Sequence, residues 1–331
     1  WVCSDRVQYS ALPPGLPDRR PADDTDAFPY RYFYVSQDGA QAYAKPADVE
    51  DGSPVEELER GWAVATTGET TWNGRTFERT KKGRFIERSQ LAPIALFSFH
   101  GEALHVAAGA SPSVAWVFPD KATVLASASA AAKVTGKRTR LQKVDALATK
   151  KVGRDMFMRV TGDDAHGEWM RAGDLRAPTT APMPEGLRAG ERWIDVELAT
   201  QTLTAYEGDR PVFATVVSTG RVAGTTPKGA FRIWVKLRTA TMANADDPGL
   251  DADAPLYSIE DVPYVQYFSN GVALHAAFWH RRFGEPHSHG CVNLAPLDAL
   301  WLFKWTTPRL PAGWDATFPT DAEPATLVRV R

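Results

Sequence analysis

The sequence predicts a mainly β protein with one principal helix near its C-terminal end. Short runs of strand-forming residues, such as 32–35, 61–65 and 82–86, are separated by turn residues along most of the chain. The clearest turn is Asn73-Gly74, because this dipeptide favours the tight turn of a β-hairpin. Hydrophobic residues make up 44% of the chain and charged residues 24%, which is the ordinary usage of proteins with packed cores.

Helical spacing begins after residue 295. Pro296 suits the first position of a helix, and Pro308 and Pro311 lie where they would end it. The residues expected to share one face are Leu297, Leu300, Trp301 and Lys304. We therefore expect a single convincing helix in this part of the chain.

The length of 331 residues predicts two or three domains. Residues 1–27 are rich in Pro, Asp and Arg and predict an extended N-terminal arm. Residues 28–110 and 111–178 each have the strand-and-turn pattern of a small β-barrel. Residues 179–187 continue a Pro-rich stretch that favours an extended linker, and residues 188–331 are predicted to form a separate domain.

Two segments of the N-terminal half share a pattern. Residues 83–91 and 167–175 have their glycine, aromatic, apolar and leucine positions in step. Both resemble the last strand and closing turn of bacterial SH3-like domains. The resemblance implies that the N-terminal half contains two diverged SH3-like β-barrels.

The net charge of −2 gives no support for a nucleic-acid partner, whose polyanionic backbone favours strongly basic surfaces. No apolar run approaches the ~20 residues that a bilayer span requires. The chain starts at Trp1 rather than Met, which favours a mature or truncated form that has lost an export signal. We expect membrane association only if a segment outside this sequence anchors the protein.

The chemistry-bearing residues gather in one segment. Four of the seven histidines lie in the stretch that leads to Cys291: His275, His280, His287 and His289. A thiol is nucleophilic as the thiolate, which a nearby histidine can generate, so Cys291 is the candidate nucleophile. A thiolate–imidazolium pair with His275 would lower the pKa of Cys291 below the ~8.5 of free cysteine. Cys3 is expected to be a second free thiol or a remnant of a lipidation site, because a disulfide would consume the nucleophile.

A zinc site is the competing interpretation of the same side chains. His287, His289 and Cys291 alternate, and His275 or His280 could complete a tetrahedral set of ligands. However, no second cysteine lies nearby and no Cys-x-x-Cys pair occurs. We expect neither a metal nor another cofactor.

His275, a loop, and then residues 288–293, Ser-His-Gly-Cys-Val-Asn, resemble the signature of the L,D-transpeptidases, whose YkuD-type catalytic domain cross-links peptidoglycan. Further segments resemble motifs of this family in their residues and in their order along the chain: 193–198, 202–208, 217–220 and 226–233. A full series of motifs in order is more specific than a lone short motif. The resemblance covers roughly residues 188–331 and implies a β-sandwich or barrel with its principal helix after the nucleophile.

The resemblance also implies roles for individual residues. Cys291 would attack a carbonyl, His275 would take and return the proton, and the backbone N–H groups of Gly290 and Cys291 would bind the developing oxyanion. Ala276 would orient His275 through its carbonyl. His289 could assist the chemistry or be a loop histidine bonded to backbone.

Other residues are expected to shape the loop or to line the peptide groove. These are Ser288, Asn293, Tyr264, Tyr267 and Trp279, with core or rim packing as the alternative for the aromatic residues. Many relatives have an arginine in place of Asn293, so a charge-based role is not expected there. For His280 and His287 we expect a solvated loop.

The implied activity is that of an exported enzyme of the cell envelope, periplasmic or otherwise extracytoplasmic, in peptidoglycan biosynthesis and the maintenance of cell shape. Such a cysteine acyltransferase would form a thioester with a donor stem peptide and transfer it to an amine of another stem or of an envelope lipoprotein, and carbapenems would target it. Two alternatives remain open. Water could resolve the thioester, giving an L,D-carboxypeptidase or a cross-link hydrolase, or the chain could be a non-catalytic cell-wall-binding protein.

Overall fold

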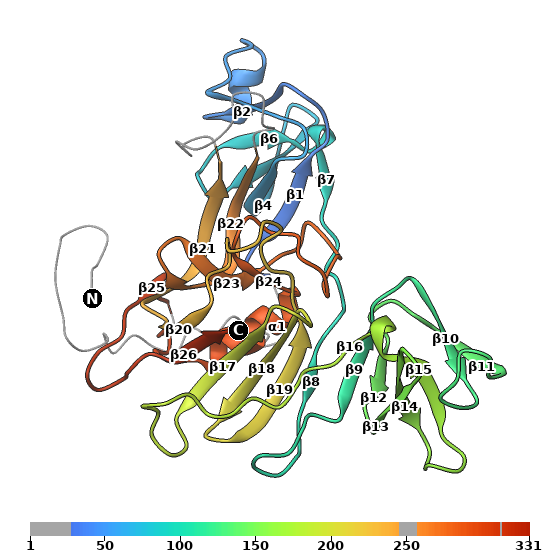
Figure 1. Cartoon of the computed structure of the whole chain (residues 1–331). Helices are drawn as coiled ribbons and strands as arrows, with labels where there is room; N and C mark the ends of the chain where they lie inside the picture. Colours follow the sequence, from blue (N-terminus) through green and yellow to red (C-terminus); the bar gives the residue numbers. More distant parts are fainter. Residues whose placement is uncertain (1–27, 245–256, 312) are drawn as a thin grey trace. The chain divides into compact units, whose positions relative to one another are not determined.

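The computed structural model describes residues 28–244, 257–311 and 313–331 (Figure 1). These residues form two compact units that interleave along the chain. The first unit contains the described residues up to Phe97 and those within 237–265 and 311–315, and the second contains 98–236, 266–310 and 316–331. The predicted arm, including Cys3, lies outside the described residues. The predicted domain boundaries stay predictions.

The N-terminal strands of the first unit pair with one another in antiparallel fashion. They are β1 Arg31–Val35, β2 Ala40–Tyr43, β3 Glu56–Leu58, β4 Ala63–Trp72, β5 Arg75–Thr80, β6 Phe85–Glu87 and β7 Leu91–Pro93, with short 3-10 turns at Pro46–Val49 and Arg88–Gln90. Asn73 and Gly74 connect β4 to β5 with φ angles of 47° and 77°, so the predicted hairpin is confirmed. Alternate side chains of β1, Phe33 and Val35, pack with Val64 of β4 into the buried cluster of this unit.

Residues 114–176 of the second unit form two small antiparallel sheets. Their strands are β9 Val114–Val117, β10 Lys121–Leu125, β11 Val134–Thr139, β12 Lys143–Asp145, β13 Ala148–Val152, β14 Asp155–Thr161, β15 Glu168–Arg171 and β16 Leu175–Arg176, with a 3-10 turn at Ala172–Asp174. The strand orders are β11-β10-β15-β14-β13 and β12-β9-β16. Both sheets contribute buried side chains to one cluster that includes Val117, Val124 and Met170.

The prediction of a mainly β fold is confirmed, but the closed barrels are not found. The sheets in the described part of the chain have free edges, because the strand at one end of each path does not hydrogen-bond to the strand at the other. In the 114–176 region the buried apolar cluster lies between two separate sheets instead of inside one closed sheet. The SH3-like assignment of the N-terminal half is not confirmed.

The largest sheet that lies wholly within the second unit has the order β20-β26-β17-β18-β19-β8. Its strands are β8 Glu102–Ala103, β17 Arg192–Glu197, β18 Thr202–Glu207, β19 Arg210–Val216, β20 Gly229–Arg232 and β26 Leu327–Val330. Figure 1 shows β17, β18 and β19 side by side. β8 pairs with β19, so residues 102–103, which the sequence grouped with the first SH3-like segment, belong to this sheet.

Two long strands, β21 Val235–Ala243 and β22 Ser258–Ser269, contain residues of both units. In the second unit, the end of β22 pairs with β23 Val272–Ala276, which in turn pairs with β24 Val292–Leu294. A two-residue strand, β25 Ala316–Thr317, pairs with β21. The predicted helix is confirmed as α1 Pro296–Trp305, which begins directly after β24.

Lys236 and Asp298 hold the two ends of α1. Asp298 is fully buried in the first turn, where a carboxylate interacts favourably with the helix dipole, and it accepts bonds from His100 Nδ1 and the Gly101 N–H, both at 2.7 Å. At the other end Lys236 Nζ donates to the carbonyls of Phe303 at 2.5 Å and Thr306 at 3.0 Å. The side chain of Lys236 is fully buried, and burial lowers its pKa to about 7.

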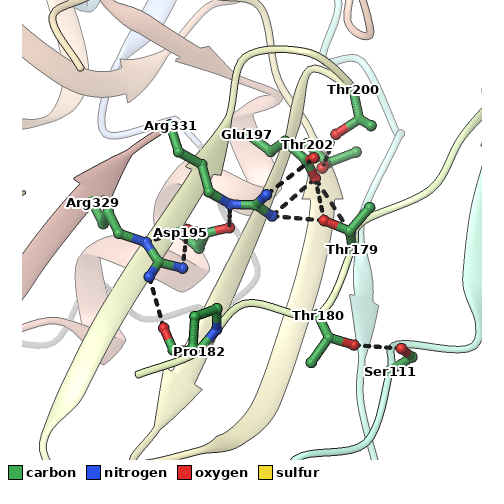
Figure 2. Close-up of polar contacts among 10 residues, drawn as sticks. All are labelled: Ser111, Thr179, Thr180, Pro182, Asp195, Glu197, Thr200, Thr202, Arg329 and Arg331. Carbon is green, nitrogen blue, oxygen red and sulfur yellow. Dashed lines mark hydrogen bonds and ion pairs between the residues drawn. The ribbon is translucent and has the colours of Figure 1, made fainter. Parts of the chain in front are cut away.

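The Pro-rich segment before β17 contains neither helix nor strand at residues 177–184, and polar contacts hold it against the sheet (Figure 2). Thr179 bonds to Glu197 through both its N–H, at 3.3 Å, and its hydroxyl, at 3.0 Å. Arg329 donates to the Pro182 carbonyl at 2.7 Å. Arg329 and Arg331 share the buried carboxylate of Asp195. The linker is therefore fixed along β17 and β26.

Candidate active site

The candidate nucleophile and base come from neighbouring strands. β23 and β24 are parallel, with His275 in register with Asn293, and Cys291 immediately precedes β24. The Sγ of Cys291 lies 3.7 Å from the carbonyl oxygen of Gly271, just before β23 begins. The apolar side chains at residues 273–274 of β23 and at residues 292 and 294 of β24 are buried, and the segment 277–291 connects the two strands.

His275 is buried, with a relative exposure of 2%. Its Nδ1 lies 2.9 Å from the carbonyl oxygen of Ala276. A carbonyl can only accept, so Nδ1 carries the proton and Nε2 keeps its lone pair. Burial lowers the pKa of His275 to about 4, opposed in part by this bond. The Ala276 carbonyl thus makes the contact that the family resemblance implied, and the lowered pKa favours a neutral imidazole.

Cys291 is partly exposed, and its thiol is free. Loss of solvent around the thiol raises its pKa, while the backbone N–H of Ala273 acts in the opposite direction. This raised pKa differs from the sequence-based expectation, which was a thiol pKa lowered by a neighbouring imidazolium. The physical reason is that desolvation penalises both charged forms, which favours a neutral thiol and a neutral imidazole.

Ser288 holds the turn before the candidate nucleophile. Its hydroxyl donates to the Cys291 carbonyl at 2.5 Å and accepts from the Gly290 N–H at 3.1 Å. The Gly290 carbonyl accepts a bond from Thr226 Oγ1 at 2.6 Å, and a Cβ on Gly290 would lie 2.8 Å from the Thr225 carbonyl oxygen. The turn therefore requires glycine at this position. The Gly290 N–H, one of the two predicted oxyanion donors, already donates to the Ser288 hydroxyl. The backbone N–H of Cys291 is the second predicted donor.

The aromatic residues of the prediction divide between the two units. Trp279 stacks on His275 with the ring centres 5.7 Å apart. Burial raises the pKa of Tyr267, and the charge of a Cys291 thiolate nearby raises this pKa further. Tyr264 is buried and belongs to the first unit. The sequence analysis missed Trp234, which is 48% exposed and lies 5.6 Å from Tyr267, ring centre to ring centre. Trp234 directly follows the family-like segment 226–233, and this position is the sequence signal that could have drawn attention to it.

The prediction of a solvated loop is wrong for His280. This residue is 9% exposed, and burial, followed by neighbouring cationic groups, lowers its pKa to about 3. The backbone turns here so that the ring packs against Phe283 and His287, with ring centres 5.0 and 4.5 Å away. His287 is half-buried, and burial is the main cause of its lowered pKa.

His289 is exposed, and its Nε2 lies 3.4 Å from a guanidinium nitrogen of Arg221. Arg221 was not singled out from the sequence, yet its backbone N–H donates to the Ser288 carbonyl at 2.9 Å, which places it next to the turn. Within residues 28–244, 257–311 and 313–331, no group of three or more His, Cys, Asp or Glu side chains is arranged to hold a metal ion.

The family comparison agrees with this geometry. The model of the YkuD family, the L,D-transpeptidase catalytic domain, matches residues 191–328, so the resemblance seen in the sequence motifs is confirmed for this part of the chain. The matched region contains Cys291 and His275. The comparison with curated proteins gave no match.

Several solved structures are similar. An L,D-transpeptidase of Enterococcus faecium is 23% identical, over 43% of this chain and 50% of that one, with a TM-score of 0.32. An L,D-transpeptidase of Stackebrandtia nassauensis is 29% identical, over 43% and 55%, with a TM-score of 0.30. L,D-transpeptidase 3 of Mycobacterium tuberculosis, in complex with a faropenem-derived adduct, is 16% identical, over 54% and 91%, with a TM-score of 0.34.

This chain spans about half the length of the first two proteins. The TM-scores are low, and the assignment of residues 191–328 rests on the family model.

Proposed function

We propose that this protein is a peptidoglycan L,D-transpeptidase that uses Cys291 as its nucleophile. The observation that carries the proposal is the family match over residues 191–328, within which the only cysteine of the described residues lies beside the strand of a buried, neutral histidine. A neutral imidazole with a free Nε2 lone pair is the form that can remove a proton from a thiol.

The chemistry follows in two stages. As the sulfur of Cys291 attacks the carbonyl of the third residue of a donor tetrapeptide stem, His275 Nε2 takes the thiol proton. The tetrahedral oxyanion accepts a bond from the Cys291 N–H. The C–N bond then breaks, the departing D-alanine amine takes the proton from His275, and a thioester remains on Cys291.

In the second stage an acceptor amine attacks the thioester. The new C–N bond forms, the C–S bond breaks, and the proton released by the amine passes through His275 to the sulfur. No metal or organic cofactor takes part in these steps. The acceptor would be the diamino acid of another stem or a lysine of an envelope lipoprotein.

Such substrates imply a location in the cell envelope, outside the cytoplasm. In the described part of the chain no helix has the length and apolar character of a membrane span. Localisation can be tested by fractionating cells that carry the full-length gene, and recovery in the cytoplasmic fraction alone would contradict this part of the proposal.

The decisive experiment is incubation of the protein with purified tetrapeptide muropeptides, followed by mass spectrometry. Cross-linked dimers that disappear in Cys291→Ala support the transpeptidase. Tripeptides without dimers would identify a carboxypeptidase, and loss of dimers added as substrate would identify a cross-link hydrolase. Unchanged muropeptides, together with a protein that sediments with insoluble peptidoglycan, would identify a wall-binding protein.

Carbapenem acylation gives an independent test of the nucleophile. The strained carbonyl of the drug should form a thioester, so the wild-type protein gains the mass of one drug molecule and Cys291→Ala gains none. Cys3 is the built-in control, because a label that persists in the variant would place the reactivity there.

A further inference from the structure

A closed ring of hydrogen bonds lies beside the candidate nucleophile. The Ser218 hydroxyl donates to the Arg282 carbonyl at 2.8 Å, and the Arg282 N–H donates to His280 Nδ1 at 3.1 Å. His280 Nε2 lies 2.9 Å from the side-chain amide of Asn293. Asn293 closes the ring through its backbone, which exchanges two bonds of 2.8 and 3.0 Å with the backbone of Ser218.

The ring determines where the proton of His280 resides. Since Nδ1 accepts from the Arg282 N–H, a neutral imidazole must carry its proton on Nε2. Nε2 then donates, so the group of Asn293 that faces it must be the oxygen Oδ1 and not the nitrogen. The structure places Nδ2 of Asn293 toward His280 Nε2 and leaves Oδ1 buried without a partner, and turning the amide over by 180° brings Oδ1 to Nε2. The lowered pKa of His280 agrees with a neutral ring.

Asn293 connects this ring to the reacting groups. It is 2% exposed in β24, two residues after Cys291, and in register with His275 on β23. Its other edge pairs with Ser218. β24, which follows Cys291, thus lies between β23 and the segment around Ser218. His280 contacts the side chain of Asn293, the central residue of β24.

We propose that His280 is a positioning residue, which donates from Nε2 to Asn293 and thereby fixes β24 and the thiol of Cys291 relative to His275. This role rests on the proposed function of Cys291 as nucleophile. It requires His275 and His280 to be neutral in opposite tautomers, with the proton on Nδ1 in the first and on Nε2 in the second.

The tautomers can be measured without any turnover. Long-range ¹H–¹⁵N spectra of protein labelled at histidine distinguish Nδ1–H, Nε2–H and imidazolium forms, and His280→Gln and His275→Ala assign the signals. We expect His280 as Nε2–H at pH 7. An Nδ1–H or imidazolium signal for His280 would overturn the proposal.

Kinetics with the donor peptide test positioning. His280→Phe keeps the ring volume but removes both polar atoms, whereas His280→Gln retains a donor at the ε position. Because small misplacements of reacting groups cost up to ~10²-fold in rate, we expect His280→Phe to lower kcat by about 10- to 100-fold with KM nearly unchanged, and His280→Gln to regain most of that loss. His166→Phe, which changes an exposed histidine outside this ring of hydrogen bonds, is the control and should retain the wild-type kcat.

Folding of the variants is checked by circular dichroism, and rates are normalised to the alkylatable Cys291. If His280→Phe does not fold, His280→Gln is compared with His280→Asn, which keeps only the δ acceptor; equal rates for these two would overturn the proposal, as would a wild-type kcat in His280→Phe. A wild-type protein with both tautomers as stated but no turnover would instead refute the proposed function and leave the ring assignment standing.

Discussion

Replacing His275 with alanine tests how the candidate thiol and imidazole rest before substrate binds. In water, moving a proton from a thiol with a pKa of 9.0 to an imidazole with a pKa of 6.5 costs about 3.4 kcal/mol. Burial lowers the pKa of His275 to about 4, which adds about 3.4 kcal/mol, and the raised pKa of Cys291 adds more.

The attraction between the two charges offsets only part of this cost. At contact distance and an effective dielectric constant of about 20, an ion pair gains roughly 4 kcal/mol. The neutral pair is therefore favoured by about 3 kcal/mol or more, so fewer than about 1% of molecules hold the thiolate–imidazolium pair at rest. Proton transfer must then accompany attack on the substrate.

The assay is the rate of Cys291 alkylation by iodoacetamide against pH, followed by peptide mapping so that Cys3 is counted separately. We expect one step with a midpoint above the ordinary thiol pKa of 9.0. His275→Ala should shift it by less than about half a pH unit, because a neutral ring contributes no charge, while turnover falls about 10²- to 10⁴-fold. A wild-type midpoint below 8.5 that rises in His275→Ala would refute the neutral pair.

Three further predictions concern stability. His275 and His280 titrate near 6.5 in the unfolded chain but near 4 and 3 when folded, so the unfolding free energy should fall as pH drops from 6.5 to about 4, by about 1.4 kcal/mol per pH unit for each histidine. Denaturant titrations check this, and an equal slope in His280→Gln would contradict it. Lys236→Met removes the buried ammonium that donates to the carbonyls of Phe303 and Thr306 at the end of α1 and should cost about 1–3 kcal/mol, against less than about 0.5 kcal/mol for the exposed control Lys304→Met. Gly290→Ala should disrupt the turn, since its Cβ would meet a backbone oxygen at 2.8 Å, and unchanged carbapenem acylation of this variant would argue against the strain.

The sequence alone determined the local elements and the candidate chemistry. The Asn73-Gly74 hairpin and the helix after Pro296 follow from nearest-neighbour preferences that need no other part of the chain. The segment around Cys291 likewise carries its family signature in consecutive residues, and the family match over residues 191–328 bears it out. Turns, helix starts and short motifs are local, so they can be read from order and spacing.

Only the tertiary structure decided pairing, burial and protonation. Nothing in the sequence near Glu102 shows that this residue would pair with β19. Nothing in the order of residues shows that the described residues within 237–265 would join the first unit, because such contacts connect distant segments. His280 looked like a loop residue, yet it is buried, and it contacts the backbone N–H of Arg282 and the side-chain amide of Asn293. The raised pKa of Cys291 has the same origin, since desolvation depends on which distant atoms exclude water from a group.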